Sequence, residues 1–267
     1  GSESPAATMS NPMDFVSPTE HVELPSRGKG YPQGHPLYNQ ETIEIKYMTA
    51  KEEDILSSRS LLKKGLAIER LIESVICDRN ISAKELLVGD RNSILIAARR
   101  SAYGNIYSTK VTCPSCNSVG EHDFDLNESS FYEGEGYEEY NIETTPQGLF
   151  KVILPITAFV IEYRLLKGQD ELEMVKRAQK VAKQKVMEQN VSDQLRKFIV
   201  SVNGYTELKV INHAIKNLPA KDSIFLRSAY KASSPDIKIS DDFSCSSCGF
   251  EQELEVPFGA DFFWPNR

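Results

Sequence analysis

Hydrophobic and polar residues alternate in several short segments of the chain, and this alternation predicts strands. Residues 42–47 read TIEIKY, which would place Ile43 and Ile45 on one face of a strand and their polar neighbours on the other. Six further segments have strand character, at residues 107–111, 120–126, 149–155, 158–163, 237–243 and 250–256. Strands are therefore expected in three separate parts of the chain.

Other segments carry apolar residues at helical spacing. The clearest are residues 66–77 and 91–103, in which apolar side chains recur every three or four positions. Asp90 is expected to cap the second of these helices, and Gly104 to end it. Helices are also predicted to start at the capping boxes Thr49–Glu52 and Ser82–Glu85. Four more are predicted at residues 170–189, 193–202, 207–217 and 219–232.

The two ends of the chain show no such periodicity. Residues 1–40 are rich in Pro, Gly and Ser, and we expect an expression scar (residues 1–8) followed by a flexible N-terminal arm. Such an arm either fastens to a partner or is merely mobile. Residues 257–267 form an aromatic C-terminal tail that contains Phe262, Phe263 and Trp264. These three aromatics are the candidate partner-binding residues, and the alternative is that the tail folds back over its own core.

Composition places the chain among ordinary globular proteins and opposes two classes of partner. It has 267 residues, of which 26% are charged, and a net charge of −7. An acidic protein is poorly suited to non-specific nucleic-acid binding, which needs a basic surface. No apolar run approaches the roughly 20 residues that span a bilayer, so no membrane partner is expected.

Four of the five cysteines form two C-x-x-C pairs, Cys113 with Cys116 and Cys245 with Cys248. Each pair lies between two predicted strands, and a turn of this length lets both thiolates face one ion. Four thiolates in tetrahedral geometry suit Zn²⁺, and a closed set of four ligands leaves no position for a substrate water. We therefore expect one structural zinc ion per chain.

Other interpretations of the cysteines are weaker. Redox C-x-x-C pairs lie at the start of a helix in a βαβ unit, and neither pair here does. His122 and Asp123 are replacement ligands of lower rank, and Cys77 on an apolar helix is expected to be a buried core thiol. The pairs are about 130 residues apart, far more than the usual 15–20 of a compact ribbon, so a shared site would make residues 117–244 an insertion between two halves of one ribbon.

The predicted fold is α+β, with a mainly helical body and a small antiparallel four-cysteine zinc ribbon assembled from two distant knuckles. Residues 41–106 form the N-terminal strand and helical region. Residues 107–126 and 237–256 form the two halves of the ribbon, and residues 127–236 form the inserted strand and helical region.

No catalytic motif was found. The sequence lacks a phosphate-binding Gly-rich loop, a Gly-x-Ser-x-Gly elbow and a His-Glu-x-x-His pair. We therefore predict a protein that is not an enzyme and has no small-molecule substrate. Two charged stretches stand out, an acidic one at residues 127–143 and a basic one at residues 176–185, and both are expected to be solvated surfaces.

Several motifs in order resemble those of the T4-type tailed-phage baseplate hub proteins and hub assembly chaperones. They are LPSRGKGYP at residues 24–32, Asp90 through RRSAYG at residues 99–104, CPSC at 113–116, LPAKDS at 218–223, CSSCG at 245–249 and FFWP at 262–265. This resemblance implies a non-enzymatic assembly factor or structural component of the central hub of a contractile tail baseplate. Its partners would be other baseplate hub proteins. It would act in the cytoplasm of the host bacterium during assembly, or in the virion. The alternative from another class is a zinc-ribbon nucleic-acid-binding protein, which the basic stretch alone supports.

Overall fold

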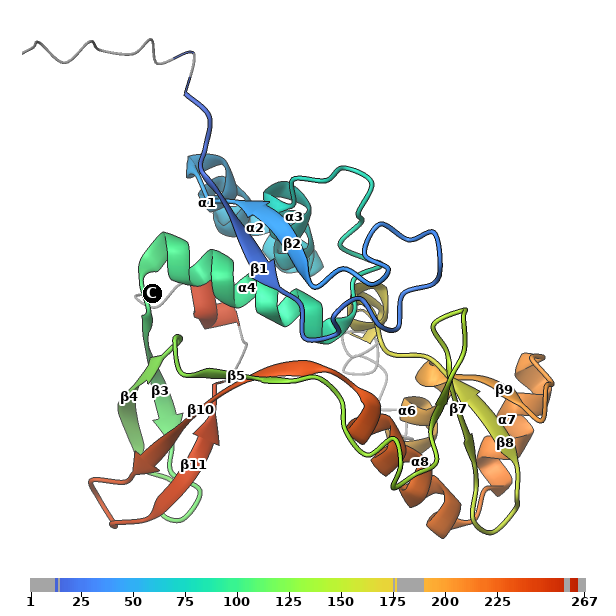
Figure 1. Ribbon diagram of the computed structural model, residues 1–267. Coiled ribbons are helices and arrows are strands. Elements are labelled where there is room, and N and C mark those ends of the chain that lie inside the picture. Colours follow the sequence, from blue (N-terminus) through green and yellow to red (C-terminus); the bar gives the residue numbers. More distant parts are fainter. Residues whose placement is uncertain (1–12, 14, 175, 177–189, 257–259, 264–267) are drawn as a thin grey trace, which may run out of the picture.

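The computed structural model describes residues 13, 15–174, 176, 190–256 and 260–263. Within these residues, the strands form four small antiparallel sheets, and a 16-residue helix, α4 (Val88–Tyr103), lies between them. Figure 1 shows the N-terminal elements above α4, one group of strands below it at the left and a second α/β group at the right.

The N-terminal part combines a two-stranded sheet with short helices. β1 (Thr19–Glu23) pairs with β2 (Thr42–Lys46), and apolar residues of both strands face the core. The chain then forms α1 (Ala50–Ser57), α2 (Arg59–Lys64) and α3 (Ala67–Val75). Leu71, Ile72 and Val75 of α3 are buried, as their helical spacing predicted.

Residues 24–32 are folded against α4. The buried carboxylate of Asp90 accepts hydrogen bonds from the Ser26 amide (3.1 Å), the Ser26 hydroxyl (2.7 Å) and the Tyr31 hydroxyl (2.7 Å). The Tyr31 hydroxyl also accepts from the Leu87 amide. Burial raises the pKa of Asp90, and the bonds from Ser26 and Tyr31 oppose that shift. α4 begins at Val88 with Leu87 as its N-cap, so Asp90 fastens the preceding segment and does not cap the helix.

A long strand links the two groups below α4. β10 (Asp236–Ser244) pairs through its first half with β5 (Ser129–Tyr132) and through its second half with β11 (Glu251–Glu255). Gly89 of α4 lies so close to Pro235 that a Cβ atom there would be 2.1 Å from the Pro235 carbonyl oxygen. Beside β10, β3 (Ile106–Thr112) and β4 (Val119–Asp125) form a two-stranded hairpin.

The second α/β group contains a four-stranded sheet in the order β6-β7-β8-β9. Its elements are β6 (Glu143–Thr144), β7 (Phe150–Ile153), β8 (Val160–Tyr163), α6 (Asn190–Phe198), β9 (Ile199–Val202), α7 (Leu208–Asn217) and α8 (Ala220–Ser233). Asp222 in the first turn of α8 is fully buried and accepts from the amides of Ile156 (2.8 Å) and Thr157 (2.9 Å) and from the Thr157 hydroxyl (2.7 Å). This carboxylate joins α8 to the β7–β8 turn.

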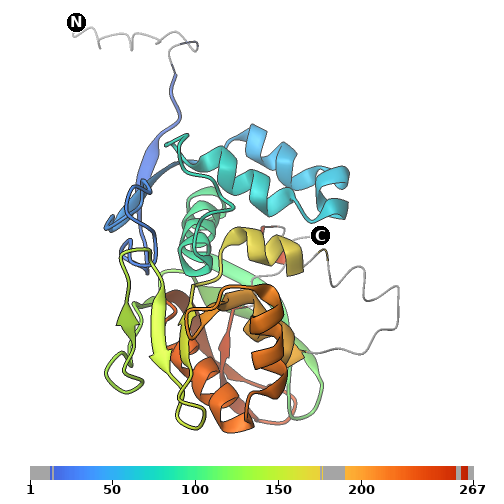
Figure 2. The same ribbon diagram turned by 90° about the vertical axis from the view of Figure 1, so that its right-hand side faces the viewer.

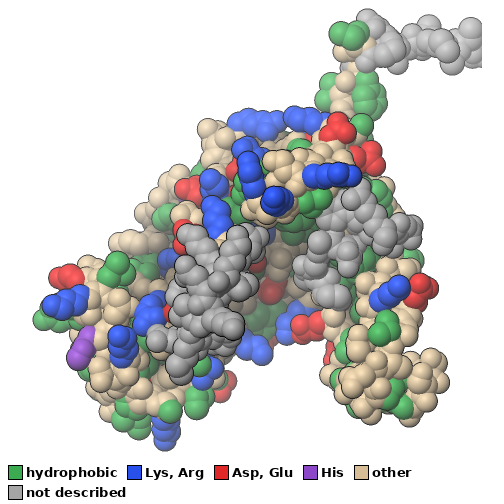
Figure 3. Space-filling view, turned by 180° about the vertical axis from the view of Figure 1, so that it is seen from behind, with side chains coloured by type: hydrophobic (Ala, Val, Ile, Leu, Met, Phe, Trp, Pro, Cys, Tyr) green, Lys and Arg blue, Asp and Glu red, His purple; other side chains and the backbone are tan. Residues whose placement is uncertain are grey.

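The overall shape is an arch. Seen from behind, the cysteine-bearing strands and the β7–β9 group project from the body with a hollow between them (Figure 3). At the opposite side, residues 15–18 lead away from the body ahead of β1, with Phe15 and Val16 exposed (Figure 2). No helix among the described residues has both the length and the apolar character needed to cross a membrane.

The prediction of a mainly helical body was wrong. Helices make up 36% of the structure and strands 26%, so the fold is α+β, with four antiparallel sheets in the part of the chain that the structure describes. The strand content was underestimated because β1, β5, β6 and β9 were not predicted as strands. β9 shows the effect. Residues 193–202 were predicted as one helix, but α6 ends at Phe198 and the β-branched run from Ile199 pairs with β8.

The predicted flexible arm also differs from the structure in its described part. β1 lies within residues 1–40, and Leu24, Tyr31 and Leu37 are in the main core. Turn residues dominate this segment because its chain reverses tightly. At Gly28, where φ is +72°, a Cβ atom would meet three backbone atoms of residues 37–40 at about 2.4–2.5 Å. The helix predicted at 170–189 lies mostly outside the described residues.

Candidate metal centre

The two cysteine pairs lie in turns with the same backbone hydrogen bonds. In the first turn the Cys113 amide donates to the Ser118 carbonyl, and the Asn117 amide donates to the Cys113 carbonyl. In the second turn the Cys245 amide donates to the Phe250 carbonyl, and the Gly249 amide donates to the Cys245 carbonyl. Each turn joins two antiparallel strands, β3 with β4 and β10 with β11. Two matching knuckles thus face each other.

Both knuckles require the same backbone conformation one residue after their second cysteine. Asn117 has a φ of +58° and Gly249 a φ of +69°, which is the left-handed region. Glycine adopts this conformation without steric cost, and asparagine tolerates it better than most residues.

The four sulfur atoms lie close together. Cys113 Sγ is 3.8 Å from Cys248 Sγ, Cys116 Sγ is 3.7 Å from Cys245 Sγ, and all four lie within 4.8 Å of one another. A zinc ion bound at about 2.3 Å to four tetrahedral thiolates would set neighbouring sulfurs about 3.8 Å apart. The same separations are far longer than the ~2.05 Å S–S bond of a disulfide. The donor set and its spacing fit a tetrahedral metal ion.

The surroundings of Cys116 and Cys245 favour the thiolate, the form that binds metal. The Ser118 hydroxyl lies 3.0 Å from Cys116 Sγ and 3.3 Å from Cys245 Sγ. Hydrogen bonds from Ser118 and from the Cys248 and Ser247 amides lower the pKa of Cys245 to about 6. Hydrogen bonding to Ser118 also lowers the pKa of Cys116. At Cys248 the hydrogen bond with the Phe250 amide lowers the pKa, but the neighbouring cysteines outweigh it. The pKa of Cys248 is therefore raised to about 11. When a cation binds four thiolates, the protons that the thiols still carry are released.

A small apolar cluster of its own supports the site. Cys113, Cys245 and Phe243 are buried together, with Val111, Phe250 and Leu254 packed around them, whereas Cys116 and Cys248 are exposed. The β3–β4 and β10–β11 turns lie at the tip of one leg of the arch (Figure 1), so an ion bound there would have two buried and two exposed ligands.

The lower-ranked ligand candidates point elsewhere. His122 Nε2 is 3.2 Å from Asp241 Oδ2, and its ring packs edge-on against Phe124 and Phe243. Asp123 accepts a hydrogen bond from Ser108. Both residues therefore hold strands of the ribbon together. Cys77 lies apart from the group, next to the end of α3, and is half-buried.

Sequence reasoning missed Ser118 as part of the site. Its hydroxyl contacts sulfurs of both knuckles, whereas the equivalent position of the second knuckle is Phe250. The available signal was a hydroxyl residue two positions after the second cysteine of a knuckle, which is weak because serine is common in turns.

Two of the predicted partner-binding aromatics lie in this chain's own core. Phe262 is 1% exposed and Phe263 is 2% exposed, in the short 3₁₀ helix η2 (Ala260–Phe263). The Phe262 ring meets Tyr107 edge-on at 5.1 Å, and its carbonyl accepts a 2.9 Å hydrogen bond from Arg99 Nε. This is the alternative in which the tail folds back. Trp264 lies outside the described residues.

Arg99 binds this tail to the start of the ribbon. Besides the Phe262 carbonyl, its guanidinium donates to the carbonyls of Gly104 and Ile106, and it lies 5.1 Å above the Tyr103 ring. Burial lowers the pKa of Arg99 from its ordinary value. One side chain of α4 therefore joins the helix, β3 and the C-terminal segment.

Comparison with known proteins gave a family match. The family described as T4 bacteriophage base plate protein matches residues 17–264. No curated protein and no solved structure matches the chain. The match includes both cysteine knuckles, the Asp90 segment and η2. Because it covers nearly the whole chain, this protein belongs to the T4 bacteriophage base plate protein family.

Proposed function

We propose that the protein is a structural component or assembly factor of the central hub of a phage tail baseplate, without enzymatic activity and with one structural zinc ion. The observation that carries the proposal is the family match over residues 17–264. We base the assignment to the hub and the role as an assembly chaperone on the motifs at residues 24–32 and 218–223, which lie within this match. The protein would act in the host cytoplasm during assembly and in contact with other hub proteins.

Those two motifs have structural roles that fit a protein built for a stable shape. Ser26 and Tyr31 of the first motif bind the buried Asp90, and Asp222 of the second binds the β7–β8 turn. A scaffold needs such internal fastening because its surfaces must keep fixed relative positions. The motifs thus fasten segments of the fold to one another, which supports a structural role.

Zinc is proposed as the metal because four sulfur ligands close the coordination sphere. A complete Cys₄ set leaves no open position for a reacting group, so the ion would act in folding. Iron also accepts four thiolates in this geometry, and the mass of the bound ion distinguishes the two.

The charge of the ribbon opposes the alternative of nucleic-acid binding. Residues 106–126 and 236–256 contain nine carboxylate side chains and two lysines. Four thiolates around a divalent cation add further negative charge, and a phosphate backbone is repelled by such a surface. In a gel-shift assay at low salt we expect no DNA or RNA complex.

Native mass spectrometry of the purified chain, alone and mixed with baseplate hub proteins of the same phage, tests the proposal. We expect one zinc ion per chain and a complex of defined stoichiometry with a hub protein. Other baseplate proteins serve as matched controls. A complex with those controls but not with hub proteins would overturn the hub assignment, and a metal-free chain would overturn the zinc assignment.

A further inference from the structure

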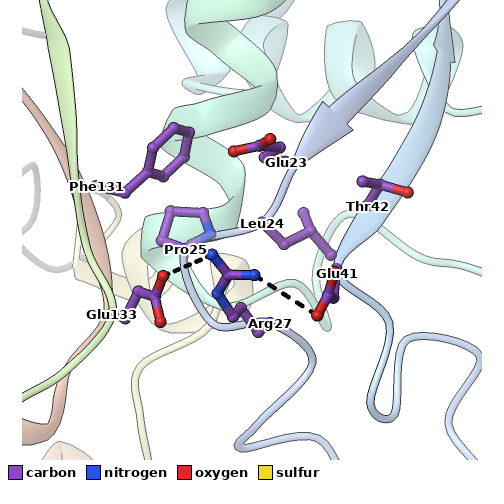
Figure 4. Close-up of a pocket in the computed structure, with 8 residues that line it drawn as sticks. All are labelled: Glu23, Leu24, Pro25, Arg27, Glu41, Thr42, Phe131 and Glu133. Carbon is purple, nitrogen blue, oxygen red and sulfur yellow. Dashed lines mark ion pairs between the residues drawn. The ribbon is translucent and has the colours of Figure 1, made fainter.

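A pocket distant from the cysteines lies between the β1–β2 region and β5. Its volume is about 170 Å³, and Figure 4 shows its lining residues converging from the two sides. A cavity of about 150 Å³ lined by apolar side chains accepts a benzene molecule. The pocket therefore has room for one side-chain head group.

The pocket combines an apolar floor with an acidic rim. Leu24 and Pro25 are buried beneath it, and the Phe131 ring of β5 is 42% exposed beside it. The rim carries Glu23, Glu41 and Glu133.

One cation lies among the three carboxylates. The Arg27 guanidinium pairs with Glu133 at 2.7 Å and with Glu41 at 3.5 Å. Its hydrogen bond lowers the pKa of Glu133, so this carboxylate is ionised at neutral pH. With three carboxylates and one guanidinium, the lining keeps an excess of negative charge. The side chains of Glu41 and Glu133 are 71% and 47% exposed, so both are accessible to an incoming group.

The strand beside the pocket has an unpaired edge. β5 is the outer strand of the sheet β11-β10-β5, and within the described part of the chain only β10 pairs with it. An extended peptide can add to such an edge through main-chain hydrogen bonds, while its alternate side chains enter neighbouring pockets. The residues after β5 continue the negative charge, because residues 133–143 contain five glutamates and no lysine or arginine.

We propose that this pocket and the adjoining edge of β5 bind an extended segment of a partner protein that carries lysine or arginine at alternate positions. One cationic head group would lie beside the Arg27 guanidinium, next to Glu23 and the exposed sides of Glu41 and Glu133, with its aliphatic stem against Phe131. Charge complementarity selects a basic segment over an acidic or purely apolar one. The proposal does not depend on the metal or on the assignment to the hub.

The test uses the full chain and a short fluorescent peptide of alternating lysine and valine, with binding followed by fluorescence anisotropy. We expect saturable binding that weakens with salt, and no binding of the same peptide with glutamate in place of lysine. The double variant Glu41→Gln/Glu133→Gln should bind about tenfold more weakly. The Phe131→Ala variant should also bind more weakly.

The matched control is Glu138→Gln/Glu139→Gln, which removes the same charge from exposed positions of the same acidic stretch outside the pocket lining. We expect this variant to bind as the wild type does. Equal losses in the two double variants would show general attraction to an acidic surface and would overturn the proposal, as would a wild type that fails to bind the lysine peptide. Sedimentation velocity adds a further check. Self-association of the wild type that the pocket variants abolish would assign the site to a second copy of this chain and refute a separate partner.

Discussion

At the scale of single residues, buried carboxylates determine how the segments of this chain are fastened together. Glu52 accepts hydrogen bonds from the Thr49 amide (2.8 Å) and the Ser74 hydroxyl (2.5 Å), and its carboxylate lies 3.0 Å from the Lys46 ammonium. It thereby joins the start of α1 to α3 and β2. Although burial alone would raise the pKa of Glu52, the bonds from Ser74, Thr49 and Lys46 lower it to about 2.

A folded-state pKa below that of the unfolded chain makes stability depend on pH. The Glu52 interactions contribute fully above its ordinary pKa of 4.5, and their contribution is lost as the pH falls toward 2. We expect Glu52→Gln to lower the free energy of unfolding by about 2 kcal/mol at pH 7, less than the full linkage value because Lys46 is partly exposed. Urea denaturation at several pH values between 7 and 3 measures this.

The matched control for this prediction is Glu53→Gln, one position further on and exposed. The wild type and the Glu53 variant should lose stability in parallel below pH 4.5, whereas the Glu52 variant should show a shallower decline. A Glu52 variant with the same acid profile as the wild type would contradict the assignment.

The sequence revealed only part of these roles. The Thr49–Glu52 pattern predicted a carboxylate at a helix start, because a capping box joins residues three positions apart. The bond to Ser74 spans 22 positions, and those from Ser26 and Tyr31 to Asp90 span 64 and 59. No local pattern specifies such distances, so Asp90 was predicted as a helix cap.

At the scale of elements, alternation predicted β2, β7, β8 and the strands around the two knuckles, but it did not predict β1, β5, β6 and β9. The strands around both knuckles follow from alternation plus the C-x-x-C turns, and β3, β4, β10 and β11 lie where expected. β1 was missed because it lies in a segment rich in Pro, Gly and Ser, and β5 because its pairing partner is distant in sequence. β5 is specified by its contact with β10, more than 100 residues later.

The contact between α8 and the β7–β8 turn depends on a single carboxylate. Asp222→Ala would leave the Ile156 and Thr157 amides without their acceptor in a partly buried turn. We expect a loss of about 2–4 kcal/mol in the free energy of unfolding, by chemical denaturation, because hydrogen bonds to a buried charge are among the strongest. The neighbouring exposed residue provides the control, and Lys221→Ala should change stability by less than about 0.5 kcal/mol. Similar effects of both substitutions would refute this role.

The C-terminal segment offers a direct choice between packing and partner binding. Because Phe262 is buried against Tyr107, Phe262→Ala should lower the free energy of unfolding by about 3–5 kcal/mol, or the melting temperature by roughly 10 °C. Phe15→Ala removes an exposed ring and should leave the melting temperature unchanged. A Phe262 variant that melts like the wild type but loses a hub partner would instead support the partner-binding interpretation.

At the scale of the whole molecule, the two knuckles bring together residues that are 129 and 135 positions apart. The sequence predicted this meeting because both pairs share one spacing and one strand context. It could not predict what the intervening residues do. After β4 the chain returns along α4 to β5, which pairs with β10. It then forms a second group of strands and helices at the other end of the arch (Figure 1). The four cysteines therefore close a loop that contains about half of the chain.

The proposed closure by a metal ion predicts that loss of the ion affects the whole fold. Cys245 is buried, and its sulfur lies within hydrogen-bonding distance of the Ser118 hydroxyl and next to the Cys116 sulfur. Cys245→Ser therefore removes one ligand from the centre of the group. We expect the variant to lose the metal and its melting temperature to fall by roughly 10 °C or more, because metal binding to a folded site is coupled to folding. Metal content by mass spectrometry and melting by circular dichroism measure the two effects on one sample.

Cys77→Ser is the matched control, since that cysteine lies outside the group, and it should keep both metal and stability. A chelator added to the wild type should reproduce the Cys245 effect and leave the Cys245 variant unchanged. If the variant loses its metal yet melts with the wild type, the knuckles are held by β10 and its neighbours alone, and the ion does not fasten the two ends of the fold.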